Sequence, residues 1–385
     1  MARRLIADGN SVTMVCGSYA NGKTGLTGEF ANGRRRGNVD GIDVIEYNLS
    51  YGNKDGFAKR SLTFVKFALR SVGVALTAPA DLVFATTTPL TAGIPGIAAK
   101  WLRRKPFVFE VRDLWPELPK QMGVITNPLI LWAMGALEWA SYKSADRLIG
   151  LSPGIVEGIA RYVPDRSKIA MIPNGCDMDL FGGDVTQWRP AGVAQNDFMA
   201  IFTGTHGKAN GLGAVIDAAS VLKARGISGI KLVLVGDGGE KAMLQRRVAA
   251  EGLEDTVIFH DPVPKTKLAG LMASADLGLQ ILANIPAFYY GTSPNKFFDY
   301  LSAGLLVLTN YPGWVADLVT EHTCGVAVPP DDAEAFAEGL IGMRDDAHKL
   351  SKKSQAKKLA NDVFSRDKLS NQFSCFLSNT SRVSF

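Results

Sequence analysis

Residues 291–304 read Gly-Thr-Ser-Pro-Asn-Lys-Phe-Phe-Asp-Tyr-Leu-Ser-Ala-Gly, a loop that turns into the start of a helix. Ser293 is predicted to be the N-cap, and Pro294 suits the first helical position, where its missing N–H costs nothing. Asn295 and Lys296 then fall in the first turn. The free backbone N–H groups and the helix dipole favour an anion at that end, and Lys296 adds a full positive charge.

An acidic residue lies further along the same predicted helix. Asp299 follows the helix start by about one and a half turns, and its carboxylate can accept hydrogen bonds from hydroxyl groups such as those of ribose. The segment therefore combines a phosphate cradle with a hydroxyl acceptor, which suits a nucleotide sugar or a dinucleotide. Taken alone, the same pattern is more often an ordinary capped helix whose aromatic side chains pack into a core.

The composition is that of a soluble globular protein. The chain has 385 residues, enough for two domains, with 46% hydrophobic and 21% charged residues. Its four cysteines and four histidines are scattered, which fits neither a metal site nor a disulfide framework and favours a cytoplasmic location. No apolar run approaches the ~18 residues of a membrane span, and the start does not resemble a secretory signal. The net charge of +5 is too small to predict a nucleic-acid partner.

Short apolar runs alternate with helical stretches along the chain, which predicts parallel βαβ units in doubly wound sheets. A Gly-rich and polar break near residues 181–197 divides the chain into a first domain over 1–181 and a second over 198–360. Residues 361–385 are expected to form a C-terminal helix that packs back on the first domain. Ligands are expected between the two domains, at the carboxyl ends of the strands. The strand-like runs are 11–16, 42–47, 82–85, 107–111, 147–151, 169–172, 198–203, 231–235, 257–260, 277–281, 306–309 and 325–328.

Four further strand ends carry polar or glycine-rich segments. Residues 110–117 bring together two glutamates, an arginine and an aspartate, and residues 172–177 read Ile-Pro-Asn-Gly-Cys-Asp. Residues 202–212 form a Gly-rich loop with Lys208, whose flexible backbone can approach a phosphate. Residues 235–240 form a tight turn. Each element alone is weak, because a lone Gly-rich turn is usually only a turn. Five such elements in this order are not weak.

Together these segments resemble the retaining nucleotide-sugar glycosyltransferases of family 4, over nearly the whole chain. The family has the GT-B fold, so the resemblance implies an α/β protein of two facing Rossmann-like domains with a cleft between them. The Arg-Asp-Leu-Trp-Pro-Glu run, the Pro-Asn-Gly-x-Asp element and the Ser-Pro-Asn-Lys segment look most like a bacterial branch. That branch builds the O-antigen of lipopolysaccharide, capsule and exopolysaccharide repeats of the cell envelope, often with N-acetylated amino or deoxy sugars.

The resemblance places the family's Glu-x7-Glu element on Gly291 and Asp299. Asp299 is then the expected ribose ligand, whereas Gly291 lacks the carboxylate that usually holds the sugar hydroxyls. Sugar recognition must therefore depend on backbone amides, on Thr292 or on a residue of the other domain. Pro262 and Val263, in the loop after a strand, should frame the nucleobase with backbone groups.

The family's basic pair for the donor diphosphate falls near Thr205 and Asn210, neither of which is basic. Lys208 or His206 is expected to substitute, with Lys296 sharing the charge. The resemblance thus implies a phosphate site that is poorer in cations than is usual for the family.

In the first domain, Arg112 stands where the family has the histidine of a His-Asp turn, and Asp113 follows it. Arg112 is expected to stabilise a leaving phosphate or an anionic acceptor; the alternative is an ion pair inside the 110–117 cluster. At Gly236, turn geometry is favoured over direct contact with the donor. The predicted catalytic residues are Arg112, Asp113, Lys208 and Lys296, and the predicted donor-binding residues are Gly204, His206, Asn210, Gly236, Pro262, Val263, Thr292, Ser293, Pro294, Asn295 and Asp299.

Two basic and apolar segments indicate a membrane surface. Residues 58–70 place Leu62, Val65 and Leu69 on one stripe flanked by lysines and arginines, and residues 101–105 add a second basic and aromatic cluster. This pattern fits an interfacial helix on an anionic leaflet, or a basic surface for a lipid diphosphate. A core-facing helix with solvated cations fits about equally well.

The start of the chain departs from the family pattern. Residues 1–9 look like the end of the first helix and residues 11–16 like the first strand. About one βα unit of the first domain is therefore expected to be missing, which would remove a central strand and expose apolar sheet edges.

These features predict a retaining, metal-independent hexosyltransferase that needs no cofactor. Protein cations would neutralise the leaving nucleoside diphosphate, with a UDP-sugar favoured over a GDP-sugar as donor. The acceptor would be a lipid-linked saccharide or polysaccharide precursor at the inner face of the cytoplasmic membrane. Two alternatives stay open: another enzyme on this fold, such as a nucleotide-sugar epimerase, and a non-catalytic or truncated partner protein.

Overall fold

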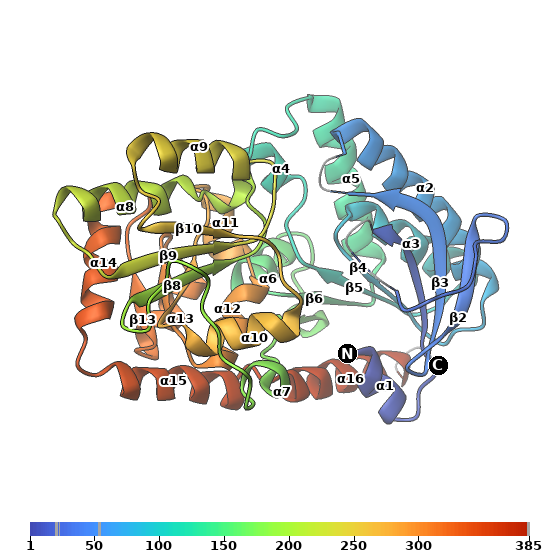
Figure 1. The fold of residues 1–385 in the computed structure, drawn as a ribbon. Coiled ribbons are helices and arrows are strands. Elements are labelled where there is room, and N and C mark those ends of the chain that lie inside the picture. The colour runs from blue at the N-terminus through green and yellow to red at the C-terminus, as the bar shows by residue number, and fades with distance from the viewer. Residues whose placement is uncertain (20–21, 23, 53–54, 383–385) are drawn as a thin grey trace. The chain divides into compact units, whose positions relative to one another are not determined.

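The chain folds into two compact units, each with its own hydrophobic core (Figure 1). Unit 1 comprises Met1–Pro173 and Asp367–Phe385, and unit 2 comprises Asn174–Arg366. The chain leaves unit 1 after Pro173, earlier than the predicted boundary at residue 181, and its last residues return to unit 1. The structure is a computed structural model, and it describes residues 1–19, 22, 24–52 and 55–382.

The described strands of unit 1 form two separate sheets. The first has the order β1-β3-β2, with β1 parallel and β2 antiparallel to the central β3. The second is parallel throughout, in the order β4-β5-β6-β7. The strands are β1 (Thr13–Tyr19), β2 (Arg34–Val39), β3 (Ile42–Tyr51), β4 (Val83–Thr86), β5 (Phe107–Val111), β6 (Arg147–Gly150) and β7 (Ile169–Met171).

The sequence-based prediction missed β2 and was therefore wrong in treating this region as purely parallel. Only Asp40 and Gly41 separate β2 from β3, and both have positive φ, 52° and 84°. A two-residue loop of this kind is the usual connection of a tight antiparallel hairpin, and Asp-Gly is its commonest signal. The dipeptide was thus a visible sign of the hairpin.

Three helices of unit 1, α2, α3 and α5, lie side by side, since α3 contacts both α2 and α5 (Figure 1). No helix in the part of the chain that the structure describes is long and apolar enough to cross a bilayer. The helices of unit 1 are α1 (Ala2–Ala7), α2 (Phe57–Thr77), η1 (Leu90–Ala92), α3 (Gly93–Arg103), α4 (Glu117–Gln121), α5 (Pro128–Ser144), α6 (Pro153–Ala160), η2 (Arg166–Lys168) and, from its second residue, α16 (Arg366–Arg382).

The C-terminal helix α16 is part of the core of unit 1. The ring of Phe373 lies edge-on to that of Phe84 on β4, with centroids 5.1 Å apart. Ser374 donates a hydrogen bond of 2.6 Å to the carboxylate of Asp8, just after α1. Residues from the two ends of the chain therefore meet in one unit.

Unit 2 is built around a parallel six-stranded sheet in the order β10-β9-β8-β11-β12-β13. The chain runs outward from β8 to β10 and then restarts at β11 on the other side of β8, so the strand order reverses between β8 and β11. Ligands of open α/β sheets bind at such a switch point. The strands are β8 (Phe198–Thr203), β9 (Ile230–Val235), β10 (Val257–His260), β11 (Leu277–Gln280), β12 (Leu306–Thr309) and β13 (Gly325–Ala327).

Helices cover the sheet of unit 2, and α12 packs directly on its centre. The buried Tyr300 hydroxyl accepts a 3.0 Å hydrogen bond from the Thr203 N–H at the end of β8. Its ring lies so close to β11 that a Cβ on Gly278 would be 2.4 Å away. The helices are α7 (Met178–Phe181), η3 (Lys208–Asn210), α8 (Gly213–Ala224), α9 (Lys241–Glu251), α10 (Lys265–Ser274), α11 (Pro286–Gly291), α12 (Asn295–Ala303), α13 (Trp314–Glu321), α14 (Ala333–Asp345) and α15 (Lys349–Asp362).

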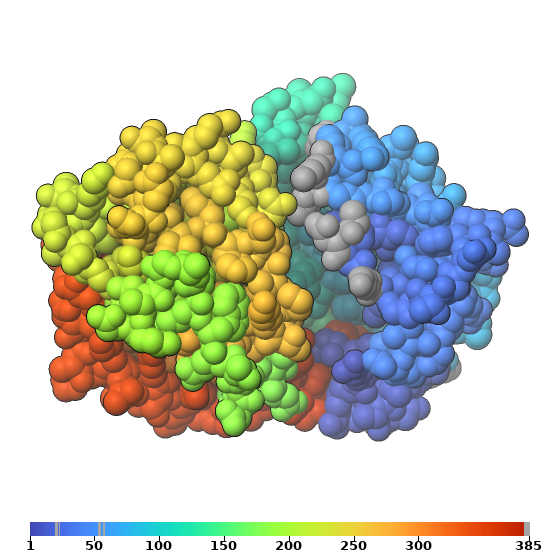
Figure 2. Space-filling view, in the orientation of Figure 1, coloured from blue at the N-terminus to red at the C-terminus, as the bar shows by residue number. Residues whose placement is uncertain are grey.

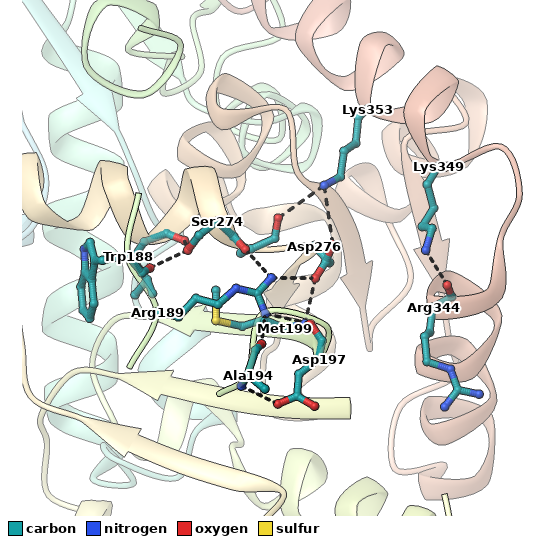
Figure 3. Close-up of polar contacts among 12 residues, drawn as sticks. Trp188, Arg189, Ala194, Asp197, Met199, Ser274, Asp276, Arg344, Lys349 and Lys353 are labelled. Carbon is teal, nitrogen blue, oxygen red and sulfur yellow. Dashed lines mark hydrogen bonds and ion pairs between the residues drawn. The ribbon is translucent and has the colours of Figure 1, made fainter. Parts of the chain in front are cut away.

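The segment before β8, predicted as a linker, is fastened to unit 2 by Trp188 and Arg189 (Figure 3). The Arg189 guanidinium donates 2.8 Å hydrogen bonds to the carbonyl oxygens of Ala194 and Asp197. It also donates to the Ser274 carbonyl at 2.9 Å and lies 3.7 Å from a carboxylate oxygen of Asp276. The segment is therefore an ordered part of unit 2.

Replacement of Arg189 by alanine should destabilise unit 2. The change removes three hydrogen bonds and leaves partly buried carbonyl groups without their donor, so the expected loss is about 2–4 kcal/mol in the free energy of unfolding. Urea unfolding of the full chain measures it as a lower midpoint. The exposed Arg246 on α9 is the matched control, and Arg246→Ala should cost less than about 0.5 kcal/mol. Equal midpoints for the two variants would contradict the anchoring role.

Candidate donor site in unit 2

The candidate site lies at the carboxyl edge of the unit 2 sheet, where the loops after β8 and β11 meet at the switch point. The Ala283 N–H, after β11, donates a 3.0 Å hydrogen bond to the Ala209 carbonyl, after β8. Gly211 has a φ of 55°, and a Cβ there would lie 2.8 Å from the Cα of Ala283. A glycine is thus required for the two loops to approach this closely.

The loops after β8 and β9 also lie backbone against backbone. The His206 N–H donates to the Asp237 carbonyl at 2.9 Å. Gly236 has a φ of 151°, and a Cβ there would lie 1.8 Å from the carbonyl oxygen of Gly204. The structure places both predicted donor-binding glycines, Gly204 and Gly236, in this contact, so Gly236 serves the turn and the loop packing.

His206 is buried between two aromatic rings, those of Phe202 and Phe259, with centroids 6.1 and 6.0 Å away. Neither ring nitrogen has a hydrogen-bond partner among the described residues. Burial, with a smaller contribution from Lys241, lowers the pKa of His206 to about 4. The imidazole is therefore neutral near pH 7, and the expectation that it substitutes for a phosphate cation does not fit this environment.

Lys296 reaches from the first turn of α12 into the loop after β8. Its ammonium donates a 2.8 Å hydrogen bond to the side-chain oxygen of Asn210 and lies 4.5 Å from the ring centre of Phe202. The other end of the Asn210 amide donates to the Thr205 carbonyl at 2.7 Å. Burial lowers the pKa of Lys296 to about 7. Lys296 of α12 thus brings a basic group to the loop that carries Thr205 and Asn210, neither of which is basic. Lys208, in η3 of the same loop, is exposed.

The start of α12 differs from the prediction. The helix begins at Asn295, so Pro294 occupies the N-cap position and no side chain caps the helix. Ser293 was predicted as the cap, but its hydroxyl instead accepts a 3.0 Å hydrogen bond from the backbone N–H of Asn174. The Pro-Asn-Gly element after β7 is thereby tied to the loop before α12, since the Asn174 amide also donates to the Ser293 carbonyl. The helix N–H groups remain free of a side-chain cap.

Asp299 is largely buried on α12, with 9% of the residue exposed. Burial raises the pKa of its carboxyl, whereas the positive charges of Lys265 and Arg366 act in the opposite direction. Thr292, before the helix, donates its hydroxyl to the Phe288 carbonyl at 3.0 Å. The predicted ribose ligand therefore lies near two basic side chains of other elements.

Gly291 is the last residue of α11, and the space that a side chain would occupy there is open. A Cβ built there meets no atom within 4 Å, and its φ lies outside the left-handed region. A larger side chain therefore fits at this position without backbone strain. Nothing in the described structure requires a glycine where the family usually has a glutamate.

The loop after β10 holds Pro262, which is exposed, and Val263, which is half-buried. Sequence analysis missed a lysine that joins it to the loop after β9. The Lys241 ammonium donates to the Gly236 carbonyl at 3.0 Å and to the Asp261 carboxylate at 2.6 Å. A basic residue at a helix start, directly after a Gly-rich turn, was the signal available.

In unit 1, Arg112 and Asp113 follow β5 and meet the end of β4. The Arg112 guanidinium lies 3.7 Å from the carboxylate of Glu110, which is the ion pair that sequence analysis kept as an alternative. The Arg112 N–H donates to the Thr87 hydroxyl at 2.8 Å, and the Thr88 hydroxyl donates to Asp113 at 3.0 Å. Burial raises the pKa of Asp113. The two strand ends thus form one polar cluster.

Two family models together match most of the chain. A Glycosyl transferase 4-like domain matches residues 1–175, and a Glycosyl transferases group 1 domain matches residues 184–360. The chain belongs to the family 4 glycosyltransferases. The predicted family and the predicted GT-B fold are therefore confirmed.

Among curated proteins, a D-inositol 3-phosphate glycosyltransferase of Arthrobacter sp. (strain FB24) is 29% identical over 211 residues. The match covers 52% of this chain and 48% of that protein, so the chain spans about half the length of the curated relatives it matches.

Solved structures share the fold. HepE of Anabaena, in complex with UDP and glucose, has a TM-score of 0.64 and 20% identity, and the match covers 88% of this chain and 86% of that one. WaaG, a glycosyltransferase involved in lipopolysaccharide biosynthesis, has a TM-score of 0.67 and 16% identity, with 97% and 92% covered. Similarity at this level shows the GT-B fold and does not by itself identify a substrate.

The glycine contacts of unit 2 predict a sharp difference between two nearby positions. Gly236→Ala would place a methyl group against the Gly204 carbonyl at an unfavourable φ, so the expected loss is about 2 kcal/mol or more. Gly239→Ala is the control, because a Cβ there meets nothing within 4 Å. Thermal unfolding should show a lower midpoint for the first variant alone. Similar midpoints would contradict the backbone contact.

Proposed function

We propose that the chain is a retaining glycosyltransferase that moves a sugar from a nucleoside diphosphate sugar to a saccharide acceptor. The observation that carries this proposal is the Lys296 ammonium, held by Asn210 at the uncapped start of α12. A partly desolvated cation at the start of a helix that no side chain caps, at a switch point of the sheet, suits an anion, and a diphosphate would supply it. HepE, a structural neighbour, has been solved with UDP-glucose.

The chemistry proposed is positioning and charge stabilisation. Lys296 and the exposed Lys208 would neutralise the leaving nucleoside diphosphate in place of a metal ion, and no cofactor is required. In the retaining reaction, the acceptor hydroxyl attacks the anomeric carbon on the face that the diphosphate leaves, and a phosphate oxygen takes its proton. The bond to the diphosphate breaks as the new glycosidic bond forms. Asp299 would accept the ribose hydroxyls.

For the donor and acceptor, we favour a UDP-sugar, with an N-acetylated amino or deoxy hexose, and a lipid-linked saccharide of cell-envelope polysaccharide synthesis. The support is the resemblance of the Ser-Pro-Asn-Lys segment to the bacterial envelope branch, together with the basic and apolar surface of unit 1. This role places the protein in the cytoplasm, in peripheral contact with an anionic membrane. The second candidate, a non-catalytic partner protein, is favoured by one observation, the absence of a carboxylate at Gly291.

A thermal-shift panel of UDP, GDP, TDP and their sugars tests the donor site. Ligand that binds only the folded state raises the unfolding midpoint. We expect UDP to raise it in the presence of EDTA, and we expect the effect to be lost in Asp299→Ala and Lys296→Met. Lys208→Met should weaken the shift without abolishing it. A folded sample that responds to no nucleotide would favour the partner-protein alternative.

The affinity for UDP should fall as the pH rises. In the free protein Lys296 has a pKa of about 7, and a bound diphosphate favours its protonated form. Binding above that pH therefore requires proton uptake, and the affinity should fall on the order of tenfold from about pH 6.5 to pH 8.5. Lys296→Arg should remove this dependence, because arginine stays charged. Titration calorimetry of both proteins measures it, and parallel pH profiles would contradict the role of Lys296.

Gly291→Glu should be tolerated and should change sugar recognition. The position is open and its φ lies outside the left-handed region, so a larger side chain causes no strain and the unfolding midpoint should stay the same or rise. If the site binds a nucleotide sugar, the new carboxylate should strengthen the binding of UDP-sugars relative to UDP, by about 1 kcal/mol for one added hydrogen bond. Gly239→Glu is the control at another open glycine. An unchanged ratio of affinities would place the sugar away from Gly291.

A further inference from the structure

Three of the six tryptophans of the chain are more than half exposed, and all three lie on neighbouring helices of unit 1. Trp101 on α3 is 68% exposed, and Trp132 and Trp139 on α5 are 74% and 52% exposed. Tryptophan has the largest side chain, and exposing its apolar ring to water is unfavourable. Three exposed tryptophans on neighbouring helices therefore indicate a partner that covers them.

Most of the large exposed side chains of α5 form one stripe, and Ile130, which is 41% exposed, lies outside it. Leu129, Trp132, Trp139 and Lys143 follow one another at helical spacings of three, seven and four residues, which place them on one side of the helix. We call this stripe the α5 face. Three large apolar side chains and a terminal lysine therefore point away from the core of unit 1.

The neighbouring helices extend this surface. On α2, Leu62, Val65 and Leu69 are 55%, 43% and 63% exposed, and Leu102 on α3 is 69% exposed. Nine of the 17 exposed large hydrophobic side chains in the described part of the chain lie on α2, α3 and α5. Figure 2 shows the blue segment of α2 and the teal segment that leads into α5 at the surface of unit 1.

The charged side chains on these helices are almost all basic, although Lys59 and Lys100 are already paired with Asp55 and Asp146. The sequences of α2 and α3 contain six basic residues and no acidic residue. The single acid of α5, Glu138, is 4% exposed and accepts a hydrogen bond from the Tyr142 hydroxyl. The basic residues are Lys59, Arg60, Lys66 and Arg70 on α2, and Lys100 and Arg103 on α3.

This charge pattern identifies the occupant. Two copies of the same basic surface would repel one another, and lysine is depleted in the apolar centres of protein interfaces. Exposed tryptophans among lysines and arginines instead match the boundary of an anionic bilayer, where indole rings lie at headgroup level and basic side chains contact phosphates.

We propose that α2, α3 and α5 form a membrane-docking surface in which the α5 face enters the interface of an anionic bilayer and basic side chains outside these ion pairs, such as Arg60 and Lys66, bind its headgroups. Sequence analysis had located membrane contact on residues 58–70 and 101–105 only, so the structure adds α5 as the inserted element. The proposal rests on the proposed function for its lipid-linked acceptor, but vesicle binding requires neither donor nor acceptor.

Vesicle sedimentation of the full chain tests the surface. We expect binding to phosphatidylcholine vesicles that contain about 30% phosphatidylglycerol, little binding to phosphatidylcholine alone, and weaker binding at high salt. The double variant Trp132→Ser, Trp139→Ser should bind at least about tenfold more weakly. Arg60→Gln with Lys66→Gln should weaken binding to the anionic vesicles alone. The matched control is Leu350→Ser on α15 of unit 2, where Leu350 is 85% exposed.

The UDP thermal shift is measured on each variant in parallel. A tryptophan variant that keeps its UDP response but loses vesicles supports the docking surface independently of the donor site. The proposal is overturned if wild-type chain binds both kinds of vesicle equally, or if the tryptophan variant binds like Leu350→Ser. It is also overturned if sedimentation velocity shows a wild-type dimer that the tryptophan variant dissociates while neither protein binds vesicles.

Discussion

The site in unit 2 depends on loops that lie backbone against backbone at the carboxyl edge of the sheet. Gly236 faces the carbonyl of Gly204, and Gly211 faces the backbone of Ala283, so no side chain separates the loops after β8, β9 and β11. On the same sheet, α12 packs through Tyr300, whose hydroxyl accepts a hydrogen bond from the Thr203 N–H at the end of β8. Lys296, in the first turn of α12, thereby lies beside the loop after β8 and donates to Asn210.

In this site, Lys296 is a cation for which no carboxylate partner is found among the described residues. One amide oxygen and one aromatic face replace its hydration shell, and this exchange lowers its pKa to about 7. A buried ammonium normally has a carboxylate partner, because desolvation is costly without one. Here the uncapped N–H groups of α12 lie next to it, and they also favour negative charge. Both features would favour the nucleoside diphosphate that we propose as the ligand of this site.

Most of the fold could be predicted from the sequence, since the apolar runs of unit 2 match its strands and the motifs named the family. The site was predicted only in part. The contact between Lys296 and Asn210 joins residues that are far apart in sequence, and no spacing rule indicates it. The cap at Ser293 failed because a tertiary contact with Asn174 took the hydroxyl that local rules assign to the helix. The environment of His206 could not be predicted either, because the lowered pKa of its imidazole depends on burial, which its neighbours in sequence do not show.

The exposure of the α5 face could not be predicted from the sequence either. A helix that is apolar all round is usually a core helix, and residues 128–144 have only Glu138 and Lys143 as acidic or basic side chains. In the structure the acidic Glu138 is buried and the apolar Trp132 is exposed, whereas acidic side chains are usually exposed and large apolar ones buried. Periodicity reports which residues share a face, but it does not report which face is covered. The proposed membrane role therefore depends on the basic residues of α3, which contacts α5, and of α2, which contacts α3.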